Sequence, residues 1–228
     1  MRLAILTLLL AAQALAQSAA FDAVLHKPLW RDQAGRLELT PEAVEFQPKG
    51  DKPPLRWEYG EIQTLDRVSR TELRLLTYED VTWRLGQDRE LRFTLQTGEI
   101  GDELFRAVAA HVARPAVDRV IAEADEPRLR LSAKHLHGLG GCQGELLFYQ
   151  DRVVFDSEDD AHDRDWRLGQ GLESVWSADP FELEAHTRES RAGHRGELRT
   201  WRFQLGTRLD PELYRALKQK LYALVDRP

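Results

Sequence analysis

The sequence predicts a mostly β protein of the α+β class, built from two similar domains that each end in an amphipathic helix. The first observation is an internal repeat: the segment 102–108 returns at 210–217, so that Glu103 and Glu212 lie 109 positions apart. The second is an alternation of apolar and polar residues upstream of both copies, which is typical of half-buried strands. The third is an apolar stripe of helical period in each copy. A sheet followed by a closing helix is therefore expected twice.

The two closing helices are predicted from their apolar residues and their first positions. Asp102 and Asp210 suit the N-cap, and Pro211 suits the first helical position. The apolar stripe has a period of 3.6 residues. Its members are Leu104, Phe105, Val108 and Val112 in the first copy, and Leu213, Tyr214, Leu217, Leu221, Leu224 and Val225 in the second.

The strands upstream of the helices repeat as well. Hairpins are expected around 40–43 and 149–152, because apolar residues alternate with polar ones on both sides of each turn. The matched positions at an offset of 109 include Gly35 with Gly144, Leu37 with Leu146, Phe46 with Phe155, and Trp57 with Trp166. The segment 21–31, which precedes the first hairpin, has no clear period and is not assigned to a strand or a helix.

These motifs resemble those of bacterial pleckstrin-homology-like (PH-like) and GRAM-type domains. The shared pattern is Gly-x-Leu-x-Leu or its variant, a turn, Val-x-Phe, a Trp-containing strand, Phe-x-Leu and finally Glu-Leu in the helix. The resemblance implies two tandem barrels, each of about seven antiparallel strands closed by a C-terminal amphipathic helix. It covers most of both halves of the chain.

The expected domain boundaries follow from the repeat and from the prolines between its copies. Residues 17–114 form the first domain and 128–228 the second. The linker 115–127 begins at Pro115, which stops the preceding helix because proline cannot continue the hydrogen-bond ladder. Within the linker, 116–125 is consistent with a short helix.

Residues 1–16 have the features of a secretory signal peptide. Arg2 forms a short positive region, an apolar stretch follows over 3–12, and the small-x-small site 14–16 precedes Gln17. The sequence therefore predicts an exported protein, periplasmic or secreted, with no transmembrane segment after cleavage. The alternative is a buried N-terminal helix.

Composition and missing motifs exclude several function classes. The net charge of −6 disfavours nucleic acid as a partner. It also disfavours a general attraction to anionic membranes. The chain has no Gly-x-Ser-x-Gly elbow, no Walker loop and no His-Glu-x-x-His motif. We therefore expect neither an enzyme nor a cofactor. Cys142 is the only cysteine, so an intramolecular disulfide is impossible.

The resemblance implies a binding function, with lipids, peptides or partner proteins as ligands. The hairpin turns carry Glu42 and Asp151, with Arg152 as the one basic neighbour, whereas phosphate binding needs several cationic donors. A protein partner is therefore the leading expectation. A lipid or another small apolar ligand is the alternative.

Two sets of residues are candidates for binding. Trp176, with Asp179 and Phe181 beside it, is a candidate interface anchor, because aromatic residues dominate binding hot spots. The alternative is that Trp176 is partly buried in the core.

His135, His137 and Cys142 form a candidate metal site, since imidazole and thiolate are zinc or copper ligands. The side chains that are candidates to complete this set are His162, His186 and His194. The alternative is structural, because Gly140 and Gly141 fit a bulge at a sheet edge.

Overall fold

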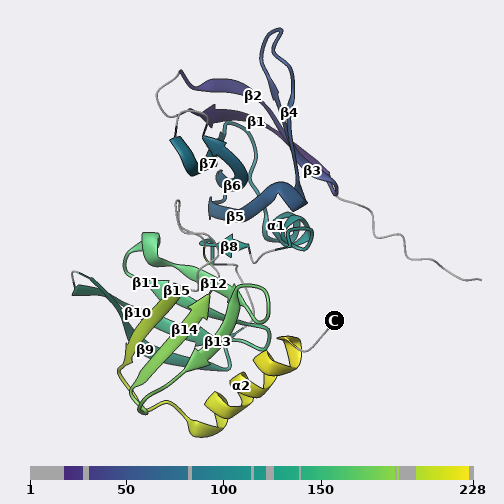
Figure 1. The fold of residues 1–228 in the computed structure, drawn as a ribbon. Helices are drawn as coiled ribbons and strands as arrows, with labels where there is room; N and C mark the ends of the chain where they lie inside the picture. The colour runs from purple at the N-terminus through teal and green to yellow at the C-terminus, as the bar shows by residue number, and fades with distance from the viewer. Residues whose placement is uncertain are drawn as a thin grey trace, which may run out of the picture.

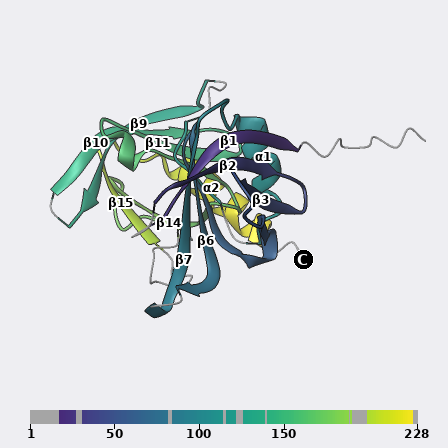
Figure 2. The ribbon, with the colours of Figure 1, turned by 90° about the horizontal axis from the view of Figure 1, so that it is seen from above.

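The computed structural model describes residues 18–27, 31–81, 84–113, 116–121, 126–138, 140–187, 189 and 199–225. The chain forms two sheets, one in each half, and each sheet is followed by a helix (Figure 1). Seen from above, the two halves overlap only in part, and β9 and β10 extend beyond the first half on the left (Figure 2). The signal peptide expected over 1–16 lies outside the described residues.

The first domain contains seven consecutive antiparallel strands and one helix. They are β1 (Ala19–His26), β2 (Gln33–Leu39), β3 (Ala43–Pro48), β4 (Leu55–Glu58), β5 (Ile62–Ser69), β6 (Glu72–Val81), β7 (Arg84–Leu95) and α1 (Asp102–Ala109). A single turn of 3₁₀ helix, Tyr59–Glu61, separates β4 from β5. The strand order is β4-β3-β2-β1-β7-β6-β5, followed by β8 from the linker.

The second domain repeats this arrangement. Its elements are β9 (Leu129–His137), β10 (Gly140–Phe148), β11 (Arg152–Ser157), β12 (Arg164–Arg167), β13 (Leu172–Trp176), β14 (Glu182–Thr187), β15 (Arg199–Leu205) and α2 (Pro211–Val225). The strand order β12-β11-β10-β9-β15-β14-β13 is that of the first sheet, with the first strand pairing the last. The predicted fold class, two PH-like barrels closed by C-terminal helices, is therefore confirmed.

The segment 21–31, which the sequence pattern left unassigned, contains most of β1, which lies in the middle of the first sheet. It pairs with β2 on one side and with β7 on the other. Phe21, Ala23 and Leu25 alternate into the core. Because β1 begins with two alanines and has a third at its centre, its hydrophobic alternation is weak, and periodicity alone does not identify it.

The linker contains a strand where the sequence suggested a short helix, so the helix prediction was wrong for the described part. Val117–Asp118 forms β8, which runs parallel to β5 and pairs with Asp66 and Arg67. Val117 is buried, and Asp118 accepts hydrogen bonds from the Arg67 side chain. These contacts with β5 favour the extended conformation. Residues 122–125 lie outside the described residues.

The two helices differ in how they begin. Asp210 caps α2 as predicted: its Oδ1 accepts a hydrogen bond from the Glu212 amide at 2.9 Å, and Pro211 is the first helical residue. In α1 the N-cap is Gly101 instead. Asp102 lies inside the first turn, and its carboxylate accepts a hydrogen bond from Arg67. The prediction of Asp102 as the N-cap was therefore off by one residue.

The repeated glycines have a packing role. A Cβ atom at Gly35 would lie 2.4 Å from the Gln47 carbonyl and 2.5 Å from the Phe46 ring. At Gly144 the corresponding atom would lie 2.9 Å from the Phe155 ring. Only glycine lets these strands approach the core phenylalanines so closely.

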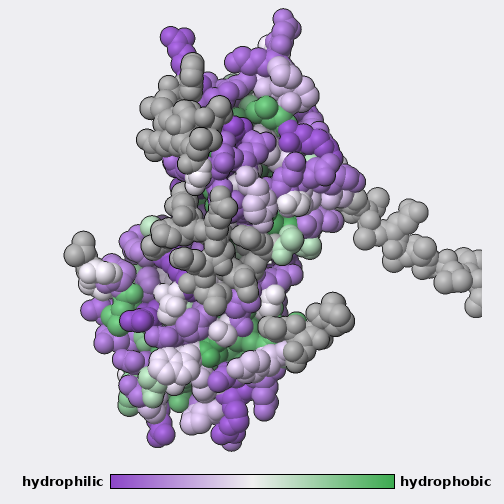
Figure 3. All heavy atoms as spheres, viewed as in Figure 1, coloured by the Kyte–Doolittle hydropathy of each residue, from purple (hydrophilic) through white to green (hydrophobic). Residues whose placement is uncertain are grey.

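Each domain has its own hydrophobic core. Trp57 and Trp166, at matched positions of the repeat, are both buried, as their recurrence indicated. Phe105 and Val108 of α1 are buried in the first core, and Leu221 of α2 is buried in the second. Hydrophilic residues cover most of the face shown in Figure 3. In the part of the chain that the structure describes, no helix is long and apolar enough to span a membrane.

Candidate functional site

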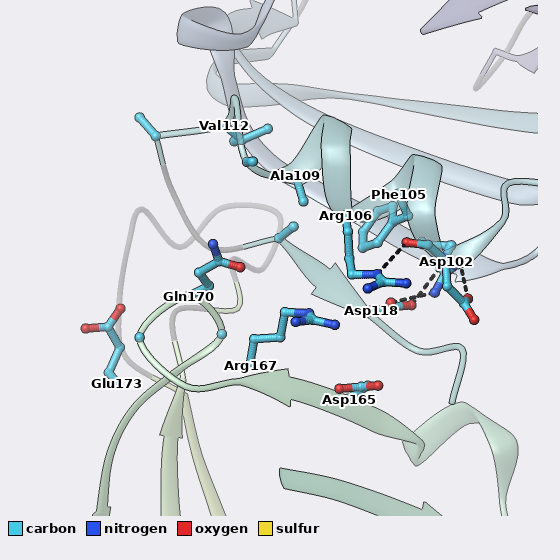
Figure 4. A pocket seen from close by; sticks show the side chains of 16 residues that line it. Asp102, Phe105, Arg106, Ala109, Val112, Asp118, Asp165, Arg167, Gln170 and Glu173 are labelled. Carbon is cyan, nitrogen blue, oxygen red and sulfur yellow. Dashed lines mark hydrogen bonds and ion pairs between the residues drawn. The ribbon is translucent and has the colours of Figure 1, made fainter. Parts of the chain in front are cut away.

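A pocket of about 530 Å³ lies between the two domains. One wall comes from α1 and the residues after it, including Phe105, Ala109 and Val112 (Figure 4). The opposite wall comes from β12 and the turn that follows it, including Asp165 and Arg167. The pocket exists because β8 and β12 bring the two barrels into contact.

Arg67 forms a buried ionic centre in the wall of this pocket. Its Nε and Nη2 bind the two carboxylate oxygens of Asp118 at 2.8 and 2.6 Å, and its Nη1 donates to Asp102 and to the Ile100 carbonyl. Its guanidinium also lies 4.7 Å from the centre of the Phe105 ring. Burial lowers the pKa of Arg67, but the two carboxylates outweigh burial and the net pKa is raised. Arg67 therefore ties β5 to the linker and to α1.

Asp165 is the least satisfied charged group in the pocket wall. It is 8% exposed, and its Oδ1 has no hydrogen-bond partner among the described residues. The nearest cation is Arg152, whose Nε lies 3.4 Å from Asp165 Oδ2 without forming a hydrogen bond. Burial raises the pKa of Asp165 to about 6. Asp165 could not be singled out from the sequence, because the neighbour of a core-facing residue such as Trp166 in a strand is expected to point away from the core.

The predicted aromatic anchor lies at the connection between β13 and β14. Trp176 is 50% exposed and Phe181 is 53% exposed. Asp179 holds the turn between them, because its Oδ1 accepts a hydrogen bond from the Phe181 amide at 2.6 Å and its carbonyl accepts one from Ser177 Oγ at 2.7 Å. The structure thus brings the three predicted residues onto one turn, with both aromatic side chains about half exposed.

The predicted metal-ligand candidates also lie close together. The ring centres of His135, His137 and His162 are 5.1 to 5.6 Å apart. Cys142 Sγ lies 3.7 Å from His135 Nδ1, and His162 Nδ1 lies 3.0 Å from an oxygen of Asp159.

The structure places one of the other two candidate histidines elsewhere. His186 instead lies within hydrogen-bond distance of Thr200. His194 lies outside the described residues.

The present side-chain arrangement of this histidine cluster is not that of a metal centre. Within the described ranges, no three His, Cys, Asp or Glu side chains are arranged to hold a metal ion. His135 is 4% exposed, and its ring centre lies 4.4 Å from that of Trp201. Burial, then the neighbouring cations, lower the pKa of His135 to about 4. Metal binding remains a prediction.

The second domain has polar residues where the first has apolar ones. Leu25 pairs with Phe93 in the first sheet, and His135 occupies the same place opposite Phe203 in the second. By the same repeat, Arg164 and Trp201 correspond to Leu55 and Leu91. The repeat did not reveal this replacement, because the strands were matched through their shared glycine and apolar residues only.

Glu189 lies at the centre of this polar cluster and is buried. Its Oε1 accepts hydrogen bonds from the indole nitrogens of Trp166 and Trp201 at 2.9 and 3.1 Å. Its Oε2 accepts from Arg164 and Arg199 at 3.2 and 3.1 Å. Burial raises the pKa of Glu189, but the two arginines outweigh it and the net pKa is lowered. The carboxylate is therefore held ionised.

Replacing His135 with leucine is expected to make the protein less sensitive to acid. The pKa of His135 is about 4 in the folded state against an ordinary value of 6.5, so the unfolded state binds more protons between these pH values. Stability of the natural chain therefore falls as the pH drops from 6.5 towards 4, and His135→Leu removes this loss. We expect the variant to gain about 2 to 3 kcal/mol relative to the natural chain between pH 7 and 4.5, measured by urea unfolding.

Two comparisons isolate the effect of His135. Asp163 and Asp165, whose pKa values burial raises to about 6, titrate in both proteins and cancel in the difference. His186→Leu, at a partly exposed position of β14, is the control. The prediction is wrong if the free energies of unfolding of His135→Leu and the natural chain differ by the same amount at pH 7 and at pH 4.5.

Comparison with known proteins adds little to the fold. No protein-family model matches the chain, and no curated protein sequence matches it. Among solved structures, the chain is similar to a chain of the Spt16D–Pob3N heterodimer at 11% sequence identity, over 84% of this chain and 98% of that one. The TM-score is 0.29. The fold assignment therefore rests on the strand order and the closing helices.

Proposed function

We propose that the chain is an exported, non-catalytic binding protein of the tandem bacterial PH-like or GRAM type, and that its second domain binds a partner protein. The observation that carries this proposal is the turn between β13 and β14, where Trp176 and Phe181 both expose about half of their surface. The signal-peptide pattern of residues 1–16 supports export.

The chemistry of this turn fits a protein partner. Tryptophan and phenylalanine bury large apolar areas on binding, and tryptophan is enriched at binding hot spots. The Asp179 hydrogen bonds hold the turn, so little conformational freedom is lost when a partner binds. Asp179 and Glu182 are exposed beside the aromatic pair. A partner surface with an apolar pocket and basic residues at its rim would complement this turn.

We expect the double variant Trp176→Ala, Phe181→Ala to lose its partner. The truncation of two central aromatic side chains weakens binding by about 100-fold or more. The measurement is affinity purification of the mature chain, residues 17–228, from its host, followed by titration of the recovered protein against each variant.

The matched control is Tyr78→Ala, which removes an aromatic side chain of similar exposure, 51%, from β6 of the first domain. It should bind the partner as the natural chain does. Unchanged affinity of the double variant would exclude this turn as the binding surface, and recovery of lipid with no protein would favour the alternative of a lipid ligand.

A further inference from the structure

We propose that the pocket between the domains binds a small organic cation that carries a short apolar tail. The inference goes beyond the proposed protein-binding function, since it concerns other residues and another class of ligand. It rests on the pocket, on one buried acceptor in its wall, and on the apolar side chains opposite.

One carboxylate oxygen of Asp165 is unsatisfied. More than nine-tenths of this residue is buried, and its Oδ1 has no hydrogen-bond partner in the described part of the chain. A buried acceptor without a donor destabilises the protein, whereas a charged donor forms the stronger class of hydrogen bond. A ligand with an ammonium group supplies the missing donor for Oδ1, whereas the paired cation Arg152 lies 3.4 Å from Oδ2.

The cations of the pocket already have acceptors. Arg67 is bound to Asp118 and Asp102. Arg167 Nη1 lies 3.1 Å from a carboxylate oxygen of Asp151, and Arg106 Nε donates to the Asp102 carbonyl at 3.0 Å. An anionic ligand would have to compete with these acceptors. A cationic ligand finds an acceptor, Asp165 Oδ1, that has no hydrogen-bond donor among the described residues, although Arg152 Nε lies 3.4 Å from Oδ2.

The wall opposite Asp165 carries apolar side chains. Phe105, Ala109 and Val112 present apolar side chains along α1 and the residues just after it (Figure 4). Ala113 also lines the pocket. A short alkyl chain beside these residues is removed from water, which favours binding. The pocket volume of about 530 Å³ is in the range of small-molecule sites.

The test uses hexylammonium as the probe and the mature chain, residues 17–228, as the protein. Hexanol and heptanoate have an alkyl chain of the same length and lack the cation. We expect saturable binding of hexylammonium by calorimetry, and much weaker binding of the other two. Absence of saturable binding, or equal binding of hexylammonium and hexanol, would overturn the proposal.

Two variants locate the site. Asp165→Asn should weaken hexylammonium binding by about tenfold or more, because the charged hydrogen bond is lost. Asp156→Asn, an exposed acid on β11, is the control and should bind normally.

Ala113→Phe fills the pocket without changing Asp165 and should also weaken binding. Near-ultraviolet circular dichroism verifies the folding of each variant. Normal binding by both folded Asp165→Asn and Ala113→Phe would exclude the pocket.

Discussion

Replacement of Glu189 with alanine is expected to lower the free energy of unfolding of the second domain by about 3 to 5 kcal/mol. The carboxylate accepts hydrogen bonds from Trp166, Trp201, Arg164 and Arg199. Its removal leaves two indole donors without an acceptor and the buried Arg164 without its counter-ion. The cost of these unpaired groups exceeds the value of any single hydrogen bond.

Urea unfolding monitored by tryptophan fluorescence measures this loss, since Trp166 and Trp201 contact Glu189 directly. Glu182→Ala, an exposed acid at the start of β14, is the control and should change stability by less than about 0.5 kcal/mol. Glu189→Gln keeps the shape but replaces one acceptor oxygen with a donor, so it should also destabilise. A loss below about 1 kcal/mol in Glu189→Ala would show that water replaces the carboxylate.

Replacement of Arg67 with methionine is expected to destabilise the first domain by about 3 kcal/mol and to release β8 from the sheet. Methionine fills similar space but leaves Asp118 without its cation and Asp102 with only the more distant Arg70. The Arg119 amide donates to the Arg67 carbonyl at 3.0 Å, so its hydrogen exchange reports on β8 directly. We expect exchange of this amide to accelerate far more than that of amides in the centre of β1.

The control for Arg67 is Arg70→Met. Arg70 also lies near Asp102, with 3.7 Å between the closest charged atoms, but its side chain is 35% exposed. Its replacement should cost less than about 1 kcal/mol, as is usual for partly exposed ion pairs. If Arg67→Met and Arg70→Met lower the free energy of unfolding equally, burial does not strengthen the ion pairs of Arg67.

Much of the fold could be predicted from the sequence, because strand alternation and helical period depend on nearby residues. The repeated glycines and the tryptophans Trp57 and Trp166 marked equivalent places in the two barrels, and the structure buries both tryptophans. β1 was missed because its alanines give little contrast between the two faces of the strand. β8 was missed because its conformation depends on β5, which lies about 50 positions earlier in the chain.

The candidate sites were less predictable. Trp176 could be chosen from its residue type and its neighbouring turn, and the structure shows it half exposed. Arg67, Asp165 and Glu189 could not be chosen, because charged residues are rarely buried and nothing local marks these as exceptions. Their burial follows from partners that the fold brings together across long stretches of chain, such as Glu189 and Trp166, 23 positions apart.

Because β8 pairs with β5, the first structural unit of this protein includes part of the linker. A fragment that ends at residue 114, after the first closing helix, would lack the strand that covers β5 and Asp118, one of the two acids that pair with Arg67. Such a fragment would expose an unpaired sheet edge and a buried cation that keeps only Asp102, and we expect it to associate with itself. Gene fusions, circular permutations and domain exchanges that keep the first barrel intact would therefore need to break the chain beyond Arg119.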